Sequence, residues 1–160
     1  MEKIALGGGC HWCTEAMFDS LDGVSHVEQG WVCAKEKTAH SFSEAVIVHF
    51  DIKLISLEKI IEIHLLTHNA TANHSMRKKY RSAIYTYSKV QKEQVQIILK
   101  EKASLFEKKI ITQIYTFHHF KLNEEKYLSY YQKNKAKPFC QKYIKPKLQK
   151  IASYYDSSCF

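Results

Sequence analysis

The sequence predicts an α+β fold, a two-layer sandwich of helices and a mixed sheet. Apolar and β-branched segments alternate with amphipathic segments in the order strand–helix–strand, strand–helix–strand, which is typical of this class. The length of 160 residues suits one domain that can bury a core, and the hydrophobic content of 45% is ordinary for a globular protein. We therefore expect a single domain over residues 1–160, with a basic tail from about residue 135 that is expected to be mobile.

The first predicted elements flank a run of three glycines. A short apolar segment predicts a buried strand at residues 3–7. After the glycines, apolar residues recur at helical spacing, which predicts a helix over residues 10–21 that Asp22-Gly23 closes. The segment at residues 26–33 is expected to form a second strand.

The remaining elements are predicted by the same two periodicities. Ser56 is a suitable N-cap, because a serine side chain can accept a hydrogen bond from the first turn of a helix. β-Branched and aromatic residues predict the later strands, and amphipathic spacing predicts the later helices. The expected order is a strand at 45–50, a helix from 57 to about 65, a strand at 82–87, a helix at 89–106, a strand at 110–117 and a short helix at 124–132.

Cys10 follows the three glycines, at the point where the first strand becomes the first helix. Glycine permits turn conformations that are closed to other residues, and it lets the backbone come close to a ligand. Free amide groups and the positive end of the helix dipole stabilise an anion at a helix start, so the pKa of the Cys10 thiol should fall. Because the thiolate is the nucleophilic form, the local sequence predicts that Cys10 is a reactive cysteine.

Cys13 lies one helical turn after Cys10, so both sulfur atoms should share a face of the helix. A pair at this spacing can form a disulfide or provide half of a zinc site. Two interpretations of the pair therefore stay open: a thiol–disulfide oxidoreductase that uses Cys10 and Cys13, and a metal-binding module. The second is the weaker, because no second pair supplies the remaining ligands.

The run Gly-Gly-Gly-Cys-His-Trp-Cys-Thr-Glu-Ala at residues 7–16 resembles the active-site signature of the type A peptide methionine sulfoxide reductase family. Further segments resemble later blocks of that family, in the right order: Phe42–Val46, His68 followed by Tyr80–Tyr85, and Asn134–Cys140. The blocks span roughly residues 4–145, and four blocks in order are a specific match. The resemblance implies a ferredoxin-like core. It also implies an enzyme that reduces methionine S-sulfoxide, either free or in oxidised proteins.

The resemblance implies roles for three catalytic residues. Cys10 is the nucleophile that attacks the sulfur of the sulfoxide. Glu44 is the acid that gives a proton to the departing oxygen, and Tyr80 forms a hydrogen bond to that oxygen through its hydroxyl group. The methyl group of the substrate needs a pocket, and Trp12 is expected to form one wall of it.

Two further substrate-binding positions depart from the family pattern. His11 stands where the family usually has phenylalanine, which keeps a flat ring but adds polarity and a group that can lend charge or a proton. Trp31 stands where the family usually has a second tyrosine that binds the oxygen. Its indole N–H can donate a hydrogen bond, but it lacks the geometry and acidity of a phenol. Both changes are expected to affect how the substrate is held.

The resemblance implies that attack by Cys10 leaves a sulfenic acid, which a second thiol converts to a disulfide. Cys140 is the expected first partner, because the family carries a resolving cysteine in its tail and the prolines on either side should keep this segment irregular and mobile. Cys13 is the fallback, and Cys159 is a candidate relay. Thioredoxin or a similar dithiol is the expected reductant, and no cofactor or metal ion is expected.

The formal charge of +8 does not indicate a nucleic-acid-binding protein, because the lysines are spread along the chain and no binding motif accompanies them. No uninterrupted apolar stretch is long enough to cross a membrane, and residues 1–9 lack the features of a signal peptide. Five cysteines without a regular spacing suit a reducing compartment, in which they are catalytic or free. We therefore expect a cytoplasmic protein, and we expect it to act as a monomer.

Overall fold

Five strands close into a barrel in the part of the chain that the structure, a computed structural model, describes: residues 1–73 and 75–157. The strands are β1 (Glu2–Gly7), β2 (Val24–Ala34), β3 (Ser43–Phe50), β4 (Ala83–Thr86) and β5 (Gln113–Leu122). Their order around the barrel is β1–β3–β2–β5–β4, and β1 pairs with β4 to close it.

The sheet is mixed, because β4 and β5 run parallel whereas the other neighbouring strands run antiparallel. This arrangement confirms the predicted α+β class and the mixed sheet. It differs from the predicted two-layer sandwich with a ferredoxin-like core in the pairing of β1. Leu6 of β1 lies opposite Val46 of β3 on one side and opposite Ile84 of β4 on the other. Both sides of this strand are therefore paired, and the sheet closes on itself.

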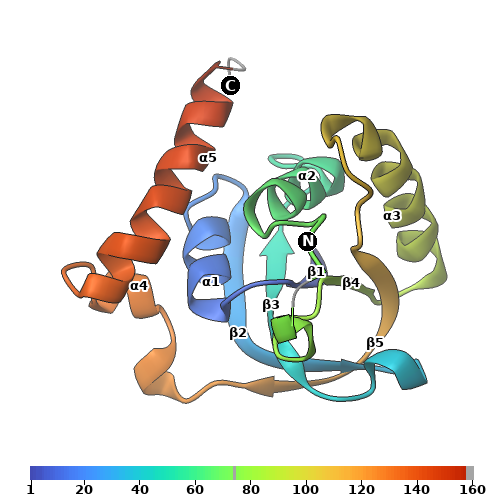
Figure 1. The fold of residues 1–160 in the computed structure, drawn as a ribbon, viewed down its shortest axis with the longest axis horizontal. Coiled ribbons are helices and arrows are strands. Elements are labelled where there is room, and N and C mark those ends of the chain that lie inside the picture. Colours follow the sequence, from blue (N-terminus) through green and yellow to red (C-terminus); the bar gives the residue numbers. More distant parts are fainter. Residues whose placement is uncertain (74, 158–160) are drawn as a thin grey trace.

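Helices lie on one side of the sheet, the first three packed against it and the last two packed against the first helix. They are α1 (His11–Asp19), α2 (Leu57–Thr67), α3 (Lys89–Lys102), α4 (Tyr130–Lys133) and α5 (Lys145–Ser157). In Figure 1, α1 lies between the sheet and α5, and α3 lies at the opposite side of the molecule. Ser56 accepts a hydrogen bond from the backbone N–H of Lys59 at 3.0 Å, which confirms the predicted N-cap of α2. No helix in the described ranges is both long enough and apolar enough to span a bilayer.

Side chains of each strand alternate between two hydrophobic cores. Leu6 of β1 packs in the larger core, which Phe18 of α1 and Ile61 of α2 share. Ala5 of β1 points the other way, into a second core that contains Tyr85 of β4. Successive residues of a strand face opposite sides of a sheet, so one face can hold the helices while the other is filled by small and aromatic side chains.

The segment from about residue 135 is largely helical, so the prediction that it resists regular structure is wrong. A π-helical turn at Cys140–Ile144 leads directly into α5. Pro146 lies in the first turn of α5, where a helix tolerates a residue without an N–H. Both ends of the π turn are fully buried against Cys13 and Ala16 of α1. This burial of apolar surface stabilises a helical conformation that the local sequence does not favour.

The helix predicted at residues 124–132 is also interrupted. It consists of a 3₁₀ turn at Glu125–Tyr127 and the short helix α4. Ser129, between them, has a φ of 52°, which is a left-handed conformation. A residue in this conformation cannot continue a right-handed helix, so the two turns remain separate.

Gly30 of β2 lies very close to the backbone of Lys121 in β5. A Cβ atom at this position would lie 2.0 Å from the carbonyl oxygen of Lys121, so an alanine requires the backbone to move. We expect Gly30→Ala to lower the free energy of unfolding, measured by urea titration, by about 3 kcal/mol. Gly9→Ala is the control, because nothing lies within 4 Å of a Cβ atom there, and its effect should stay below about 1 kcal/mol. Equal stability of the two variants would contradict the close packing of β2 on β5.

Candidate active site

Cys10 is the N-cap residue of α1, as the sequence predicts. Its carbonyl oxygen accepts hydrogen bonds from the backbone N–H groups of Cys13 and Thr14, both at 3.1 Å, so the helix begins at this residue. Its side chain is half-buried. Gly8 precedes it with a φ of 148°, and a Cβ atom on Gly8 would lie 2.2 Å from the ring of His68. The turn that leads from β1 to Cys10 therefore requires glycine.

The pKa of the Cys10 thiol is lower than its ordinary value. The main cause is the hydrogen bond from the thiol of Cys13, and the backbone N–H groups of Cys13 and Trp12 lower it further. Burial and the negative charge of Glu44 act in the opposite direction. The same contact with Cys10 raises the pKa of Cys13. Cys10 is therefore the more acidic thiol of the pair, and Cys13 is the thiol that donates to it.

Three of the four candidate thiols meet beside α1. Cys13 and Cys140 are buried in one apolar cluster, and Cys10 packs at its edge. Cys140 lies near enough to Cys13 to contribute to the raised pKa of that thiol. The fourth candidate, Cys159, lies outside the described residues. Within the described ranges, no group of three or more His, Cys, Asp or Glu side chains is arranged to hold a metal ion.

Glu44 is the second residue of β3, and its carboxyl group is buried against the start of α1. Oε1 accepts a hydrogen bond from the backbone N–H of His11 at 3.3 Å. On the other side of the carboxyl group, Nζ of Lys79 lies 3.6 Å from Oε2. A buried carboxyl group that touches the residue after the nucleophile is well placed to donate a proton to a reacting group at Cys10.

His11 and Trp31, the two positions that depart from the family pattern, lie next to Glu44. Trp31 of β2 is directly opposite Glu44 in the register with β3, and the ring of His11 meets the ring of Trp31 edge-on with 5.0 Å between centroids. Nδ1 of His11 donates to the carbonyl oxygen of Gly30 at 2.9 Å. Burial lowers the pKa of His11, so its ring is neutral at physiological pH. The structure thus brings both predicted substrate-binding residues to the predicted acid.

Tyr80 joins the site through Lys79, a residue that the sequence analysis missed. Nζ of Lys79 lies 5.1 Å from the centroid of the Tyr80 ring and 3.6 Å from Oε2 of Glu44. A hydrogen bond with Tyr80 and the charge of Glu44 raise the pKa of Lys79, so the amine stays cationic. The sequence around Lys79 does not indicate these contacts, because they depend on the loop that folds over Glu44.

Trp12 belongs to an aromatic stack that the C-terminal segment completes. The ring of Tyr130 lies nearly parallel to it with 4.0 Å between centroids, and Tyr127 stacks at 5.6 Å. Phe139 meets it edge-on at 5.4 Å. The indole Nε1–H is buried and has no hydrogen-bond partner among the described residues. The surroundings of Trp12 are therefore largely aromatic.

A buried polar network, also missed by the sequence analysis, holds α1 and the ring of His11 against β2. Gln29 donates to Oε1 of Glu15 at 3.0 Å and accepts from Asn123 at 2.7 Å. Nδ2 of Asn123 lies 3.5 Å from Nε2 of His11. Arg77 supports the site from the other side, because its guanidinium group donates to the carbonyl oxygen of Gly8 at 2.7 Å. These contacts join segments that are far apart in the sequence, so no local pattern indicates them.

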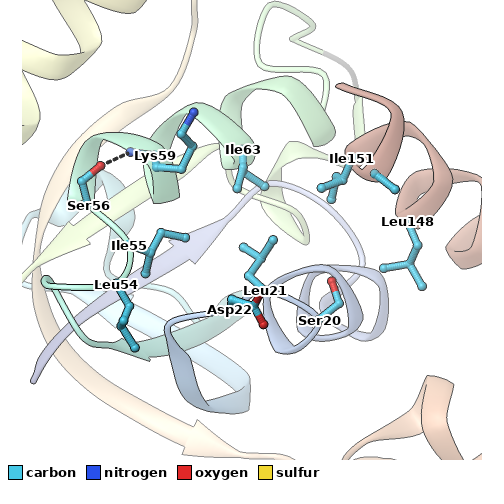
Figure 2. Close-up of a pocket in the computed structure, with 11 residues that line it drawn as sticks. Ser20, Leu21, Asp22, Leu54, Ile55, Ser56, Lys59, Ile63, Leu148 and Ile151 are labelled. Atoms are coloured by element: carbon cyan, nitrogen blue, oxygen red, sulfur yellow. Dashed lines mark hydrogen bonds between the residues drawn. The ribbon is translucent and has the colours of Figure 1, made fainter. Parts of the chain in front are cut away.

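Two clefts, of about 800 and 860 Å³, lie away from Cys10. Figure 2 shows the first, which opens between the end of α1, the loop before α2, and α5. Leu21, Ile55 and Ile151 give it a largely apolar lining. The second lies along α3. Since neither cleft is lined by a cysteine among the described residues, the candidate active site is the cluster around Cys10.

The chain is similar to known proteins over nearly its whole length. The family model described as "Peptide methionine sulfoxide reductase" matches residues 2–158. A peptide methionine sulfoxide reductase MsrA of Trichodesmium erythraeum is 34% identical, over 97% of this chain and 96% of its own length.

Solved structures of a yeast protein share the fold. Mxr1 of Saccharomyces cerevisiae in an unusual oxidised form matches with a TM-score of 0.70 and 26% identity, over 83% of this chain and 81% of that chain. Mxr1 in complex with Trx2 matches with a TM-score of 0.62 and 22% identity, over 81% of this chain and 84% of that chain.

Removal of the thiol at residue 13 tests the cause of the lowered pKa of Cys10. In Cys13→Ala, the midpoint of Cys10 alkylation by iodoacetamide should move to higher pH, because the main hydrogen-bond donor to the thiolate is lost. Cys13→Ser keeps a donor at this position, so its midpoint should remain near the wild-type value. The same midpoint in the alanine and serine variants would show that the helix start alone sets this pKa.

Proposed function

Because the chain belongs to the peptide methionine sulfoxide reductase family, we propose that it reduces methionine S-sulfoxide, free or in proteins, to methionine. The observation that carries the proposal is the contact, at 3.3 Å, between the buried carboxyl group of Glu44 and the backbone N–H of His11. This contact holds the carboxyl group against His11, the residue that directly follows Cys10 in the chain. Sulfoxide reduction by a thiol needs both groups, a sulfur nucleophile and a proton for the oxygen.

The first step consumes one thiolate and one proton. Sγ of Cys10 attacks the sulfur of the sulfoxide and forms an S–S bond while the protonated oxygen leaves that sulfur. The released hydroxyl group then attacks Sγ and displaces the methionine sulfur, so Cys10 becomes a sulfenic acid. The proton comes from Glu44 and remains on that oxygen. Cys10 is oxidised by two electrons and the substrate sulfur is reduced by two, so methionine leaves without any cofactor.

Aromatic rings next to Cys10 are the proposed binding surface for the substrate. Trp12, stacked on Tyr130 at 4.0 Å, offers an apolar wall for the methyl group. Trp31 lies beside Glu44 and offers a flat ring for the substrate side chain. We assign the hydroxyl group of Tyr80 to the sulfoxide oxygen, and the cationic Lys79 beside it adds favourable charge near that oxygen.

Cys13 is the proposed first partner of oxidised Cys10. Its thiol is hydrogen-bonded to Cys10 in the reduced protein, and that hydrogen bond is the main cause of its raised pKa. This cause disappears when Cys10 becomes a sulfenic acid, so Cys13 then becomes a better nucleophile. Its attack on Cys10 forms the S–S bond and releases the oxygen as water.

Cys140 is the proposed second thiol, rather than the first partner that the sequence analysis expected. That expectation depended on an irregular, mobile arm, whereas Cys140 lies fully buried in a helical turn beside Cys13. Exchange of the Cys10–Cys13 disulfide to a Cys13–Cys140 disulfide frees Cys10 for another cycle. A relay through Cys159 stays a prediction, because that residue lies outside the described residues.

A thioredoxin-like dithiol is the proposed reductant. The relative Mxr1 has been solved in complex with Trx2, and each turnover proposed here leaves one disulfide to be reduced. The four described cysteines are free, which suits a reducing compartment such as the cytoplasm. One chain supplies the nucleophile, the acid and the second thiol, so we propose that a monomer is sufficient for the reaction.

Thiol–disulfide exchange is the second candidate function. The observation that favours it is the hydrogen bond between Cys10 and Cys13 at the start of α1. A C-x-x-C pair with one lowered pKa at a helix start is typical of disulfide exchange. This candidate requires no binding site for a sulfoxide, so it leaves the buried Glu44 without a role.

Turnover of the two epimers of methionine sulfoxide with dithiothreitol tests the proposed reaction. The S epimer should be reduced, and Cys10→Ser should abolish this turnover because a serine hydroxyl group has no populated anion at neutral pH. Cys33→Ala is the matched control, since Cys33 is buried on β2 outside the cysteine cluster, and it should keep its activity within about twofold. Reduction of insulin disulfides without any turnover of either epimer would instead establish the second candidate.

Disulfide mapping tests the proposed order of the thiols. After oxidation by one equivalent of methionine S-sulfoxide, Cys140→Ser should contain a Cys10–Cys13 disulfide and should release one equivalent of methionine at the wild-type rate. Cys13→Ser should form a disulfide much more slowly, because Cys10 has lost its hydrogen-bonded thiol. A Cys10–Cys140 disulfide that forms in Cys13→Ser as fast as a disulfide forms in the wild type would contradict this order.

A further inference from the structure

The glycine turn before Cys10 is held in place by side chains that bind its backbone. Three glycines in a row restrict the chain very little by themselves, because glycine has the largest conformational freedom of any residue. Nε2 of His64 donates to the carbonyl oxygen of Gly7 at 2.7 Å. Nη1 of Arg77 donates to the carbonyl oxygen of Gly8, also at 2.7 Å. Two successive carbonyl groups of the turn are therefore fixed from outside it.

The guanidinium group of Arg77 binds four backbone carbonyl oxygens. Nη1 donates to Tyr80 at 3.0 Å as well as to Gly8, and it carries two hydrogens, one for each oxygen. Nε donates to Ala72 at 2.9 Å, and Nη2 donates to Asn69 at 3.0 Å. No carboxyl group among the described residues forms an ion pair with this side chain. Its contacts therefore act on the position of the backbone.

The segment that contains Tyr80 is attached to β3 as well. The carbonyl oxygen of Lys79 accepts hydrogen bonds from the backbone N–H of Glu44 at 3.0 Å and from the hydroxyl group of Ser43 at 2.9 Å. These bonds hold the segment beside the proposed acid. Nη1 of Arg77 joins the same segment to the turn before Cys10, so one nitrogen atom connects the backbone of the proposed oxygen-binding residue to the backbone that leads to the nucleophile.

We propose that Arg77 is a positioning residue that sets the place of the Tyr80 hydroxyl group relative to the sulfur of Cys10. This inference deepens the proposed function and rests on it, because it takes Cys10 as the nucleophile and Tyr80 as the group that binds the sulfoxide oxygen. The sulfur and the oxygen of a sulfoxide are one bond apart, so the reaction rate depends on the spacing of the two groups that receive them. Arg77 acts on the substrate only through the backbone of Gly8 and Tyr80.

A guanidinium group suits this task because its nitrogen atoms lie in one plane at fixed spacing. The carbonyl oxygens of Asn69 and Ala72 orient that plane, which directs the hydrogens of Nη1 toward Gly8 and Tyr80. A glutamine at position 77 is too short to reach both of these oxygens. A lysine has three N–H groups on a single nitrogen, so it keeps the charge and part of the bridge but loses the fixed plane.

A double-mutant cycle on the rate of methionine release in a single turnover tests this role. Arg77→Gln should lower the rate by about tenfold, because the spacing of Cys10 and Tyr80 is no longer fixed. Tyr80→Phe removes the hydroxyl group itself and should cost about as much. Since Arg77 acts through Tyr80, the double variant should be at most about twofold slower than the slower single variant. Arg77→Lys should lose less than Arg77→Gln.

Lys150→Gln is the matched control for the loss of a cation that binds a backbone carbonyl oxygen. Lys150 donates to Leu66 at 3.2 Å, outside the site, so this variant should keep its rate within about twofold. The cycle is repeated with Arg77→Lys, so that a folding defect in Arg77→Gln does not decide the outcome. Losses that multiply to about 100-fold in the double variant would show that Arg77 supports the fold in general, and would overturn the inference.

Alkylation by iodoacetamide separates this role from damage to the nucleophile. The groups that mainly shift the pKa of Cys10 are Cys13, Trp12 and Glu44, so its alkylation midpoint in Arg77→Gln should stay at the wild-type pH. A midpoint at higher pH that accounts for the whole loss of rate would overturn the inference and leave the proposed function intact. A wild-type protein that releases no methionine from either epimer would instead contradict the proposed function, and the inference with it.

Discussion

The hydrogen bond between the carboxyl group of Glu44 and the backbone N–H of His11 joins the sheet to the helix that carries the proposed nucleophile. Glu44 lies at the start of β3 and His11 at the start of α1, so one contact sets the proposed acid beside Cys10. The register of β2 on β3 places Trp31 opposite the acid. A slip of one residue in this register would turn the carboxyl group to the other face of the sheet and remove it from the site.

Local patterns were sufficient for the features that depend on neighbouring residues. The helix start at Cys10 and the N-cap at Ser56 each follow from a short stretch of sequence, and the α+β class follows from the order of such stretches along the chain. Closure of the barrel does not, because it requires β1 to pair with β4, a strand about half the chain away. The helical C-terminal segment was mispredicted for a similar reason. Its prolines argue against a helix locally, whereas burial of Cys140 against α1 depends on the complete fold.

The candidate site could be predicted where a residue's own chemistry, or its place in a family motif, indicates its role. Cys10, Glu44 and Tyr80 were predicted in this way, and the match of the family model confirms the resemblance on which two of these predictions depend. Lys79 and Asn123 were missed, because a lysine or an asparagine acquires a role here only through contacts made by folding. The same limit applies to the thiols. Their sequence positions favour Cys140 as the first partner of Cys10, whereas their packing favours Cys13.

Transfer of the sulfoxide oxygen to Cys10 is the event on which the proposed mechanism depends. In a Cys13→Ser, Cys140→Ser double variant, residue 13 still offers a hydrogen-bond donor, but neither buried neighbour can condense with a sulfenic acid. After one equivalent of methionine S-sulfoxide in the presence of dimedone, mass spectrometry should find one dimedone adduct on Cys10 for each methionine released. Methionine release with Cys10 unmodified, or with the adduct on another cysteine, would contradict the mechanism.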